Sequence, residues 1–260
     1  MIKAIFFDID GTLLDFNGHV SKRTRDALTV LRNKGIKIFV ATGRHRIEIE
    51  QVALNNMVFD GYVTLNGQLC LNKNHKLIHG VKIDAQDCKK LISIFNQKEY
   101  PCLIIQKDKM YINFVNDLVR KVQDTISTPI PPIEEYLSDN IYQFCVYGDE
   151  SAINNVFNQL NNCKMTKWNK YGADIISKNG GKVVGINYFI NLMRINKSEV
   201  MAIGDGENDI EMLRDVGIGV AMGNADETVK NAADLVTLDV DHDGVYFALK
   251  ELKETVKFFV

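Results

Sequence analysis

Apolar runs of strand length alternate with stretches of helical spacing at the start of the chain. The pattern predicts strands at residues 2–7, 36–40 and 62–64 and helices at 20–32 and 47–54, the second of which includes Ala53. Ser21 suits the N-cap of the first helix, and Gly35 suits its end. Strands that alternate with helices predict a parallel sheet with right-handed crossover connections.

The pattern changes after about residue 80. A helix is predicted at 85–97, and short strands at 103–105 and 111–114 flank a Lys-Asp-Lys turn, which indicates an antiparallel unit. Pro131 and Pro132 mark a break, after which the pattern predicts a strand at 142–147, a helix at 151–160 and a strand at 174–177. The middle of the chain is therefore predicted to be an α+β insertion.

The alternation returns in the last part of the chain, with helices predicted at 183–193, 210–214 and 225–232 and strands at 200–203 and 218–221. We therefore predict an α/β fold with a doubly wound, parallel-sheet, Rossmann-like core. Residues 1–81 and 180–260 would form this core, and residues 82–179 would form the inserted α+β domain. The crevice between two such lobes is a natural ligand site.

Composition narrows the class of protein. A net charge of −2 and a pI near 6.2 argue against a nucleic-acid partner, whose phosphates usually require a basic patch. The five cysteines are scattered without Cys-x-x-Cys spacing, which is typical of free thiols in a reducing compartment. The sequence has neither a signal-peptide pattern nor an apolar run of membrane-spanning length, so we expect a cytoplasmic protein with no membrane partner. It does not indicate an oligomeric state.

Two carboxylates follow the first predicted strand directly, in the sequence FDIDGT at residues 7–12. Open α/β sheets bind their ligands beyond the carboxyl ends of the strands. In a dry pocket Asp8 and Asp10 would repel each other unless one were protonated or a hard cation such as Mg²⁺ took oxygens from both. A strand followed by a plain Asp-Gly turn is the alternative, but this motif is longer than such a turn requires.

A second acidic cluster, GDGEND at residues 204–209, follows the predicted strand at 200–203. Asp205 and Asp209 would reach the same cation as Asp8 and Asp10 if the two strands were neighbours, which the topology allows. The alternative is an acidic N-cap for the next helix, a role that Asn208 and Asp209 suit.

Further positions suit an anion. Thr42 and Gly43 end one predicted strand and open a helix, where free N–H groups and the helix dipole attract a phosphate, although Thr42 would also serve as an ordinary N-cap. Lys178 and Lys182 both precede the predicted helix at 183–193, and spacing alone does not choose between them. Arg44 would bind the anion, pair with an acid or reach solvent, and we leave it out of the predicted site.

These segments, in this order, resemble the signature of the haloacid dehalogenase superfamily of phosphohydrolases. The insertion between Thr42 and Lys182 is similar to the C2-type cap domain of the Cof-like subfamily, to which bacterial sugar phosphatases belong. The resemblance rests on ATGR at 41–44, NG at 66–67, GDGEND at 204–209 and GVAMGNA at 219–225. It covers residues 1 to about 80 and about 180 to 250, and the cap in length and pattern.

By that resemblance the protein is a Mg²⁺-dependent phosphatase of small phosphate esters, with sugar phosphates as the foremost class. Asp8 would be the nucleophile that forms an aspartyl phosphate, and Asp10 the general acid and base. The resemblance favours Lys182 over Lys178 and places it at the phosphoryl group with Thr42, Gly43 and Asn208. The metal ligands it implies are Asp8, the Asp10 carbonyl, Asp205 and Asp209, the last binding the metal directly or through its neighbours.

Two other functions use similar residues. A phosphomutase or phosphotransferase would form the same aspartyl phosphate and pass the group to a second hydroxyl, so product analysis separates it from a phosphatase. A regulator would bind a phosphorylated metabolite, or hold its own phosphoaspartate, without turnover. Against the regulator stand Asp10, since a stable phosphoprotein has no use for an acid and base, and the large inserted lobe.

Overall fold

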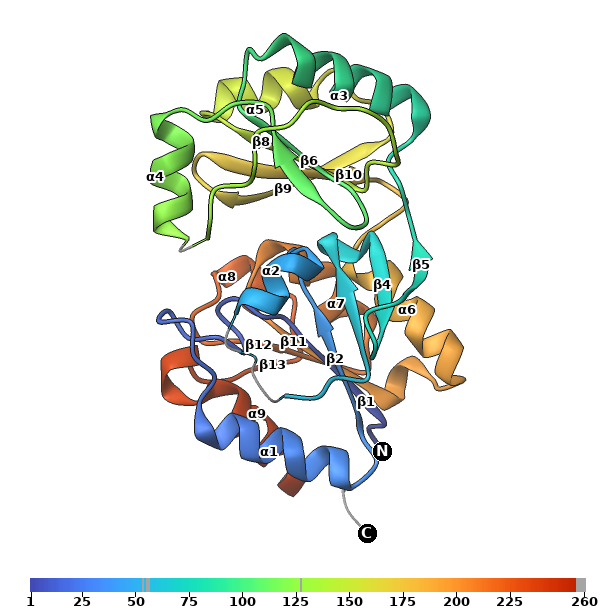
Figure 1. Cartoon of the computed structure of the whole chain (residues 1–260). Helices are drawn as coiled ribbons and strands as arrows, with labels where there is room; N and C mark the ends of the chain where they lie inside the picture. The colour runs from blue at the N-terminus through green and yellow to red at the C-terminus, as the bar shows by residue number, and fades with distance from the viewer. Residues whose placement is uncertain (53, 55–56, 127, 256–260) are drawn as a thin grey trace.

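The computed structural model of the chain describes residues 1–52, 54, 57–126 and 128–255, so the predicted helical residue Ala53 lies outside it. Two β-sheets form separate layers, the larger in the lower half of Figure 1 and the smaller above it. Within the described ranges, no helix is both long enough and apolar enough to cross a membrane.

The larger sheet has eight strands in the order β13-β12-β11-β1-β2-β3-β4-β5. Neighbouring strands from β13 to β3 are parallel, as predicted, whereas β4 and β5 add an antiparallel edge. In chain order the strands are β1 (Ala4–Phe7), β2 (Lys37–Ala41), β3 (Gly61–Thr64), β4 (Leu69–Asn72), β5 (Leu77–Gly80), β11 (Val200–Gly204), β12 (Ile218–Ala221) and β13 (Leu235–Val236).

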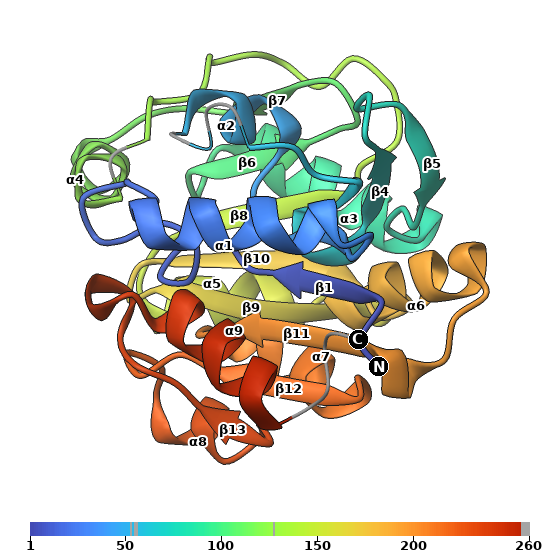
Figure 2. The same ribbon diagram turned by 90° about the horizontal axis from the view of Figure 1, so that it is seen from below.

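Helices cover both faces of this sheet, which makes it doubly wound. Ile5 and Phe7 of β1 belong to an apolar cluster with residues of α1 and α9, and Figure 2 shows these two helices side by side. Ala4 and Phe6 point the other way and belong to a cluster with α6, α7 and α8. The core helices are α1 (Lys22–Asn33), α2 (Arg46–Gln51), α6 (Lys182–Met193), α7 (Ile210–Asp215), α8 (Glu227–Lys230) and α9 (Gly244–Thr255), with short 3₁₀ turns η1 (Leu65–Gly67), η2 (Lys197–Glu199), η3 (Glu207–Asp209) and η4 (Val240–His242).

The smaller sheet is antiparallel, with five strands in the order β7-β6-β8-β10-β9, and lies wholly within residues 82–179. It carries α3 and α5 on its outer face and turns its other face toward the larger sheet (Figure 1). The elements are α3 (Ala85–Gln97), β6 (Cys102–Ile105), β7 (Met110–Ile112), α4 (Asp117–Thr125), β8 (Gln143–Tyr147), α5 (Glu150–Phe157), β9 (Cys163–Asn169) and β10 (Gly172–Ser177). This is the predicted α+β arrangement, here called the cap; the domain limits at residues 81 and 179 remain a prediction.

Most predicted elements are present, with shifts that have local causes. Ser21 is the N-cap of α1 and accepts the Thr24 N–H, as predicted. The strand predicted at 111–114 ends at Ile112. Beyond it the Cys102 N–H is accepted by the Asn113 side chain and not by a backbone carbonyl, as it would be if the strand continued. The helix predicted at 225–232 is confined to α8, whose N-cap is Asp226. The elements without a counterpart in the predictions are β4, β5, α4, β9, β13 and α9.

Candidate active site

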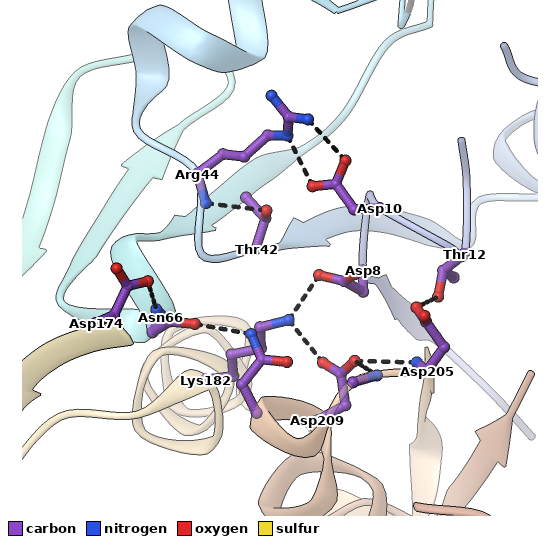
Figure 3. Close-up of polar contacts among 12 residues, drawn as sticks. Asp8, Asp10, Thr12, Thr42, Arg44, Asn66, Asp174, Lys182, Asp205 and Asp209 are labelled. Carbon is purple, nitrogen blue, oxygen red and sulfur yellow. Dashed lines mark hydrogen bonds and ion pairs between the residues drawn. The ribbon is translucent and has the colours of Figure 1, made fainter. Parts of the chain in front are cut away.

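The predicted site residues converge because their strands are neighbours. β1 pairs in parallel with β11 on one side and with β2 on the other. Asp8 follows β1 directly, Thr42 follows β2, and Asp205 follows β11. Parallel strands end at the same edge of the sheet, so these three side chains lie together beneath the cap, as Figure 3 shows.

A buried ion-pair group occupies the middle of this edge. Lys182, at the first position of α6, donates from Nζ to Oδ1 of Asp8 and to Oδ1 of Asp209, each at 2.6 Å. The side chains of Lys182 and Asp209 are fully buried, and that of Asp8 is 10% exposed. The structure therefore places Lys182 in the site, whereas Lys178 is exposed and donates to the Asn161 carbonyl.

The carboxylates of this group carry more negative charge than Lys182 neutralises. Burial raises the pKa of Asp8 well above its usual range; Lys182 opposes the rise, and the charges of Asp209 and Asp205 add to it. Burial alone would lower the pKa of Lys182, but Asp209 and Asp8 outweigh burial and raise it. Asp8, Asp205 and Asp209 each offer an oxygen, and these oxygens lie within 4.8 Å of one another. Such a set of oxygens fits a hard divalent cation.

Asp205 is held at the edge of this group by residues from two loops. Its carboxylate accepts from Thr12 Oγ1 at 2.8 Å and from Asn224 Nδ2 at 3.3 Å. Burial and Asp209 raise the pKa of Asp205 to about 7, against the opposing effect of Thr12. Gly11 has φ +73° and would clash with the Asp205 carboxylate if it carried a Cβ, so the turn after β1 requires glycine.

The two carboxylate oxygens of Asp209 have different partners. One oxygen, Oδ2, accepts the N–H groups of the preceding residues Asp205 at 3.0 Å and Gly206 at 2.9 Å, as the acidic residue of a capping box does. The other oxygen, Oδ1, pairs with Lys182. Asp209 therefore stands at the N-cap position of α7 without a side-chain hydrogen bond to that helix, and its second oxygen belongs to the buried ion-pair group.

Asp10 points away from the other carboxylates, toward Arg44. The Arg44 guanidinium donates from Nε and from one terminal nitrogen to the two Asp10 oxygens, both at 2.7 Å. The Asp10 side chain is 52% exposed and that of Arg44 16%. Asp10 is thus part of the site through a bidentate ion pair with a residue that sequence reasoning left out.

Thr42 and Gly43 lie beside a buried asparagine that the prediction did not include. Thr42 is buried, and its hydroxyl accepts the Arg44 N–H; the N-cap of α2 is His45, so Thr42 does not cap that helix. Asn66 donates its backbone N–H to the Thr42 carbonyl, and its side-chain amide lies about 3 Å from where a Cβ on Gly43 would be. Any side chain at position 43 would therefore press against Asn66.

Asn208 and Asn66 connect the core to the cap. Asn208 Nδ2 donates to Asn66 Oδ1 at 2.8 Å, and Asn66 Nδ2 donates to Gln143 of the cap at 3.1 Å. Asn66 Nδ2 also donates to Asp174 of the cap at 3.1 Å, as Figure 3 shows. Beside them lies a cavity of about 370 Å³, which Asn66, Lys182 and Asn208 line together with cap residues of β9 and β10. Two of the predicted phosphoryl-binding residues, Lys182 and Asn208, therefore face a space shared by both layers.

Sequence reasoning thus missed Thr12, Arg44, Asn66 and Asn224. Signals for all four existed, since Thr12 lies in the first acidic motif and the others lie in stretches quoted for the resemblance: Arg44 in ATGR, Asn66 in NG and Asn224 in GVAMGNA. Their partners are distant in sequence, so spacing alone did not show which contacts they make.

The doubly wound core, the buried aspartate at the end of an inner strand and the cap above it define a capped phosphohydrolase. The chain belongs to the haloacid dehalogenase-like hydrolase family, whose model matches residues 5–249. The predicted resemblance to phosphatases of this superfamily and its Cof-like members is confirmed, and the protein is an enzyme of the phosphoric monoester hydrolase class.

Individual relatives agree with this assignment. The putative phosphatase YkrA of Bacillus subtilis is 29% identical over 256 residues, which cover 96% of this chain and 97% of the relative. A phosphatase of the superfamily from Bacteroides thetaiotaomicron has a TM-score of 0.87 at 35% identity and covers 97% of this chain and 96% of its own. A sugar phosphatase of subclass IIB has a TM-score of 0.85 at 34% identity, over 96% of this chain and 99% of its own.

Proposed function

We propose that this enzyme is a Mg²⁺-dependent phosphatase of small phosphorylated metabolites, sugar phosphates above all, that works through an aspartyl phosphate in the cytoplasm. The observation that carries the proposal is the Asp8 carboxylate, held 2.6 Å from Lys182 within a group of three acids, of which Asp8 and Asp209 are buried. A nucleophilic carboxylate must meet a phosphate dianion, so positive charge beside it is essential. The likeness to a sugar phosphatase supports the substrate class.

In this proposal Asp8 attacks phosphorus and the leaving alkoxide departs with a proton from Asp10. Lys182, the Thr42 hydroxyl and the Gly43 amide hold the charge on the transferring oxygens, and Asn208 adds an amide donor. Asp8, Asp205, Asp209 and the Asp10 carbonyl would hold Mg²⁺. When bound, the ion would offset the repulsion between nucleophile and phosphate.

Asp10 must move to do this work. Both of its oxygens accept from Arg44 in the structure, so at least one must be released before Asp10 protonates a leaving group. The half-exposed side chain has room for that rotation. Arg44 would then hold Asp10 ready when no substrate is bound and release it when one is present.

The test is phosphate release from a panel of sugar phosphates, nucleotides and cofactor phosphates, with and without Mg²⁺, with Asp8→Ala as the control. Turnover that needs the metal and vanishes in the variant supports the proposal and ranks the substrates. Product analysis separates the rivals, because a phosphomutase would yield an isomerised sugar phosphate in place of free phosphate. A panel without release in any condition would contradict the proposed phosphatase activity.

A further inference from the structure

The cap sheet places one carboxylate in the middle of its inner face. Asp174 of β10 is 9% exposed, and its strand neighbours Ala173 and Ile175 point into the apolar interior of the cap. Burial raises the pKa of Asp174 to about 7. Burying an acid destabilises the fold unless hydrogen bonds compensate for the lost contact with water. The chemistry of the proposed function does not use Asp174, so its hydrogen bonds need another explanation.

Asp174 fixes the orientation of Asn66. Its Oδ1 accepts the indole N–H of Trp168 at 3.1 Å, and its Oδ2 accepts Asn66 Nδ2 at 3.1 Å. At a pH above this raised pKa the Asp174 carboxylate is ionised and only accepts, so Asn66 must turn its nitrogen toward the cap. Gln143 accepts from the same nitrogen but would flip its own amide to suit either orientation. Asp174 is therefore the group that decides which end of Asn66 faces the core.

The orientation of Asn66 in turn sets that of Asn208. With both of its N–H groups donated to the cap, Asn66 presents only its oxygen to the core, and that oxygen accepts Asn208 Nδ2 at 2.8 Å. Asn208 must therefore turn its nitrogen toward Asn66, which leaves its second N–H for another acceptor. Asn208, Asn66 and Lys182 line the same cavity, and Lys182 also donates to Asp8, the proposed nucleophile.

We infer that Asp174 is a positioning residue that completes the phosphoryl-binding site only when the cap lies against the core. The inference rests on the proposed function and deepens it, because it makes part of the phosphate recognition depend on cap closure. Through Asn66, Asp174 makes Asn208 a hydrogen-bond donor to the phosphoryl oxygens. With the cap away, Asn66 and Asn208 are free to rotate, and the site loses a preoriented donor.

The chain of contacts from Asp174 through Asn66 to Asn208 is here called the relay. Kinetic measurements on three variants test it: Asp174→Asn, Asn208→Ala and the double variant. The substrate is acetyl phosphate in Mg²⁺, because its small leaving group removes any effect of cap residues on the leaving group. We expect each single variant to lower kcat/KM about tenfold or more, the loss typical of one charge-assisted or catalytic hydrogen bond. Because Asp174 acts through Asn208, the double variant should be no slower than Asn208→Ala alone.

Asp87→Asn is the matched control, since Asp87 is a second buried carboxylate of the cap, bonded to the backbone N–H groups of Asn161 and Asn162 far from Asn66. Its effect on kcat/KM should be the same with and without Asn208→Ala. A second test keeps the relay falsifiable if Asp174→Asn folds poorly. Combining it with Asn66→Asp exchanges donor and acceptor between the two positions and should restore kcat/KM above that of either single variant.

The outcomes separate the inference from the function on which it rests. An unaltered enzyme that releases no phosphate from any substrate of the panel refutes both. An active enzyme in which the losses of Asp174→Asn and Asn208→Ala multiply refutes the relay alone. Loss with a sugar phosphate but none with acetyl phosphate would also refute the relay, since it would mean that Asp174 contacts the leaving group directly.

Discussion

The ion pairs of Lys182 give the sharpest stability prediction. Lys182→Met keeps most of the aliphatic side chain but removes the only charge that the structure pairs with the buried oxygens Asp8 Oδ1 and Asp209 Oδ1 among the described residues. Breaking a buried ion pair from one side usually costs about 3–5 kcal/mol, because the remaining charge is left without a partner. Lys178→Met is the matched control, since the exposed ammonium of Lys178 donates to the Asn161 carbonyl. We expect it to change the free energy of unfolding by no more than about 0.5 kcal/mol.

The stability lost in Lys182→Met should depend on pH in a defined direction. In the folded protein the pKa of Asp8 lies above its ordinary value of 3.8, so between these two values the folded state binds more protons than the unfolded state. In that window the free energy of unfolding falls as pH rises. Lys182 opposes the rise in the pKa of Asp8, so its removal deepens this fall. The difference between Lys182→Met and the unaltered protein should therefore be largest near pH 8 and shrink toward pH 5.

Urea unfolding in EDTA at several pH values measures both effects, since the chelator keeps divalent ions from replacing the lost positive charge. Adding Mg²⁺ should then stabilise Lys182→Met more than the unaltered protein, because the variant site carries one more net negative charge. Equal free energies of unfolding for Lys182→Met and Lys178→Met at pH 8, or a difference that grows as the pH falls, would refute the reasoning.

Two further predictions concern the turns around the site. Gly11→Ala should raise the Mg²⁺ concentration needed for half-maximal activity, because a Cβ there meets the Asp205 carboxylate. Gly18 has a similar φ of +76° but open space around it, so Gly18→Ala should only lower the free energy of unfolding, by about 1–2 kcal/mol. A titration of activity with Mg²⁺ that gives the same midpoint for both variants would contradict this. Arg44→Met should lower kcat/KM at least about tenfold, since the acid that it holds ready in the free enzyme loses its fixed position. Arg46→Met, which removes an ion pair on α2, is the control, and equal kcat/KM values for the two variants would count against a role for Arg44.

The core was predictable because its signals are local. An apolar run followed by acids marks both a buried strand and its carboxyl end, which is how Asp8 and Asp205 were placed at the same edge of the sheet. The helix at 85–97 was predicted with the bounds it has, since its apolar positions repeat at helical spacing and Asp84 caps it. In such segments the sequence pattern and the packing agree.

The missing elements lack such patterns. β9 contains Lys164, Lys167 and Asn169, so it shows few of the apolar side chains that mark a strand. The antiparallel strands β4 and β5 are short, and β5 is only half-buried, so no alternation separates it from a loop. These strands form through pairing with their neighbours, and the partner is not visible in a local window.

The site residues that escaped prediction have the same cause. Asn66 bonds to Asp174, which lies 108 positions away, and Arg44 bonds to Asp10, 34 positions away. Asp10 and Arg44 each looked plausible in several roles from their own segments. Only the packing of cap on core and of β1 beside β2 selects one of those roles.

The central proposal is that Asp8 carries the phosphoryl group during turnover. Mass spectrometry of the enzyme, quenched in acid while it hydrolyses a substrate with Mg²⁺, tests this most directly. We predict a phosphorylated peptide with the modification on Asp8, present only while substrate remains and absent from Asp8→Asn. Sustained phosphate release by Asp8→Asn, or turnover of the unaltered enzyme with a modification at another residue, would contradict the proposal.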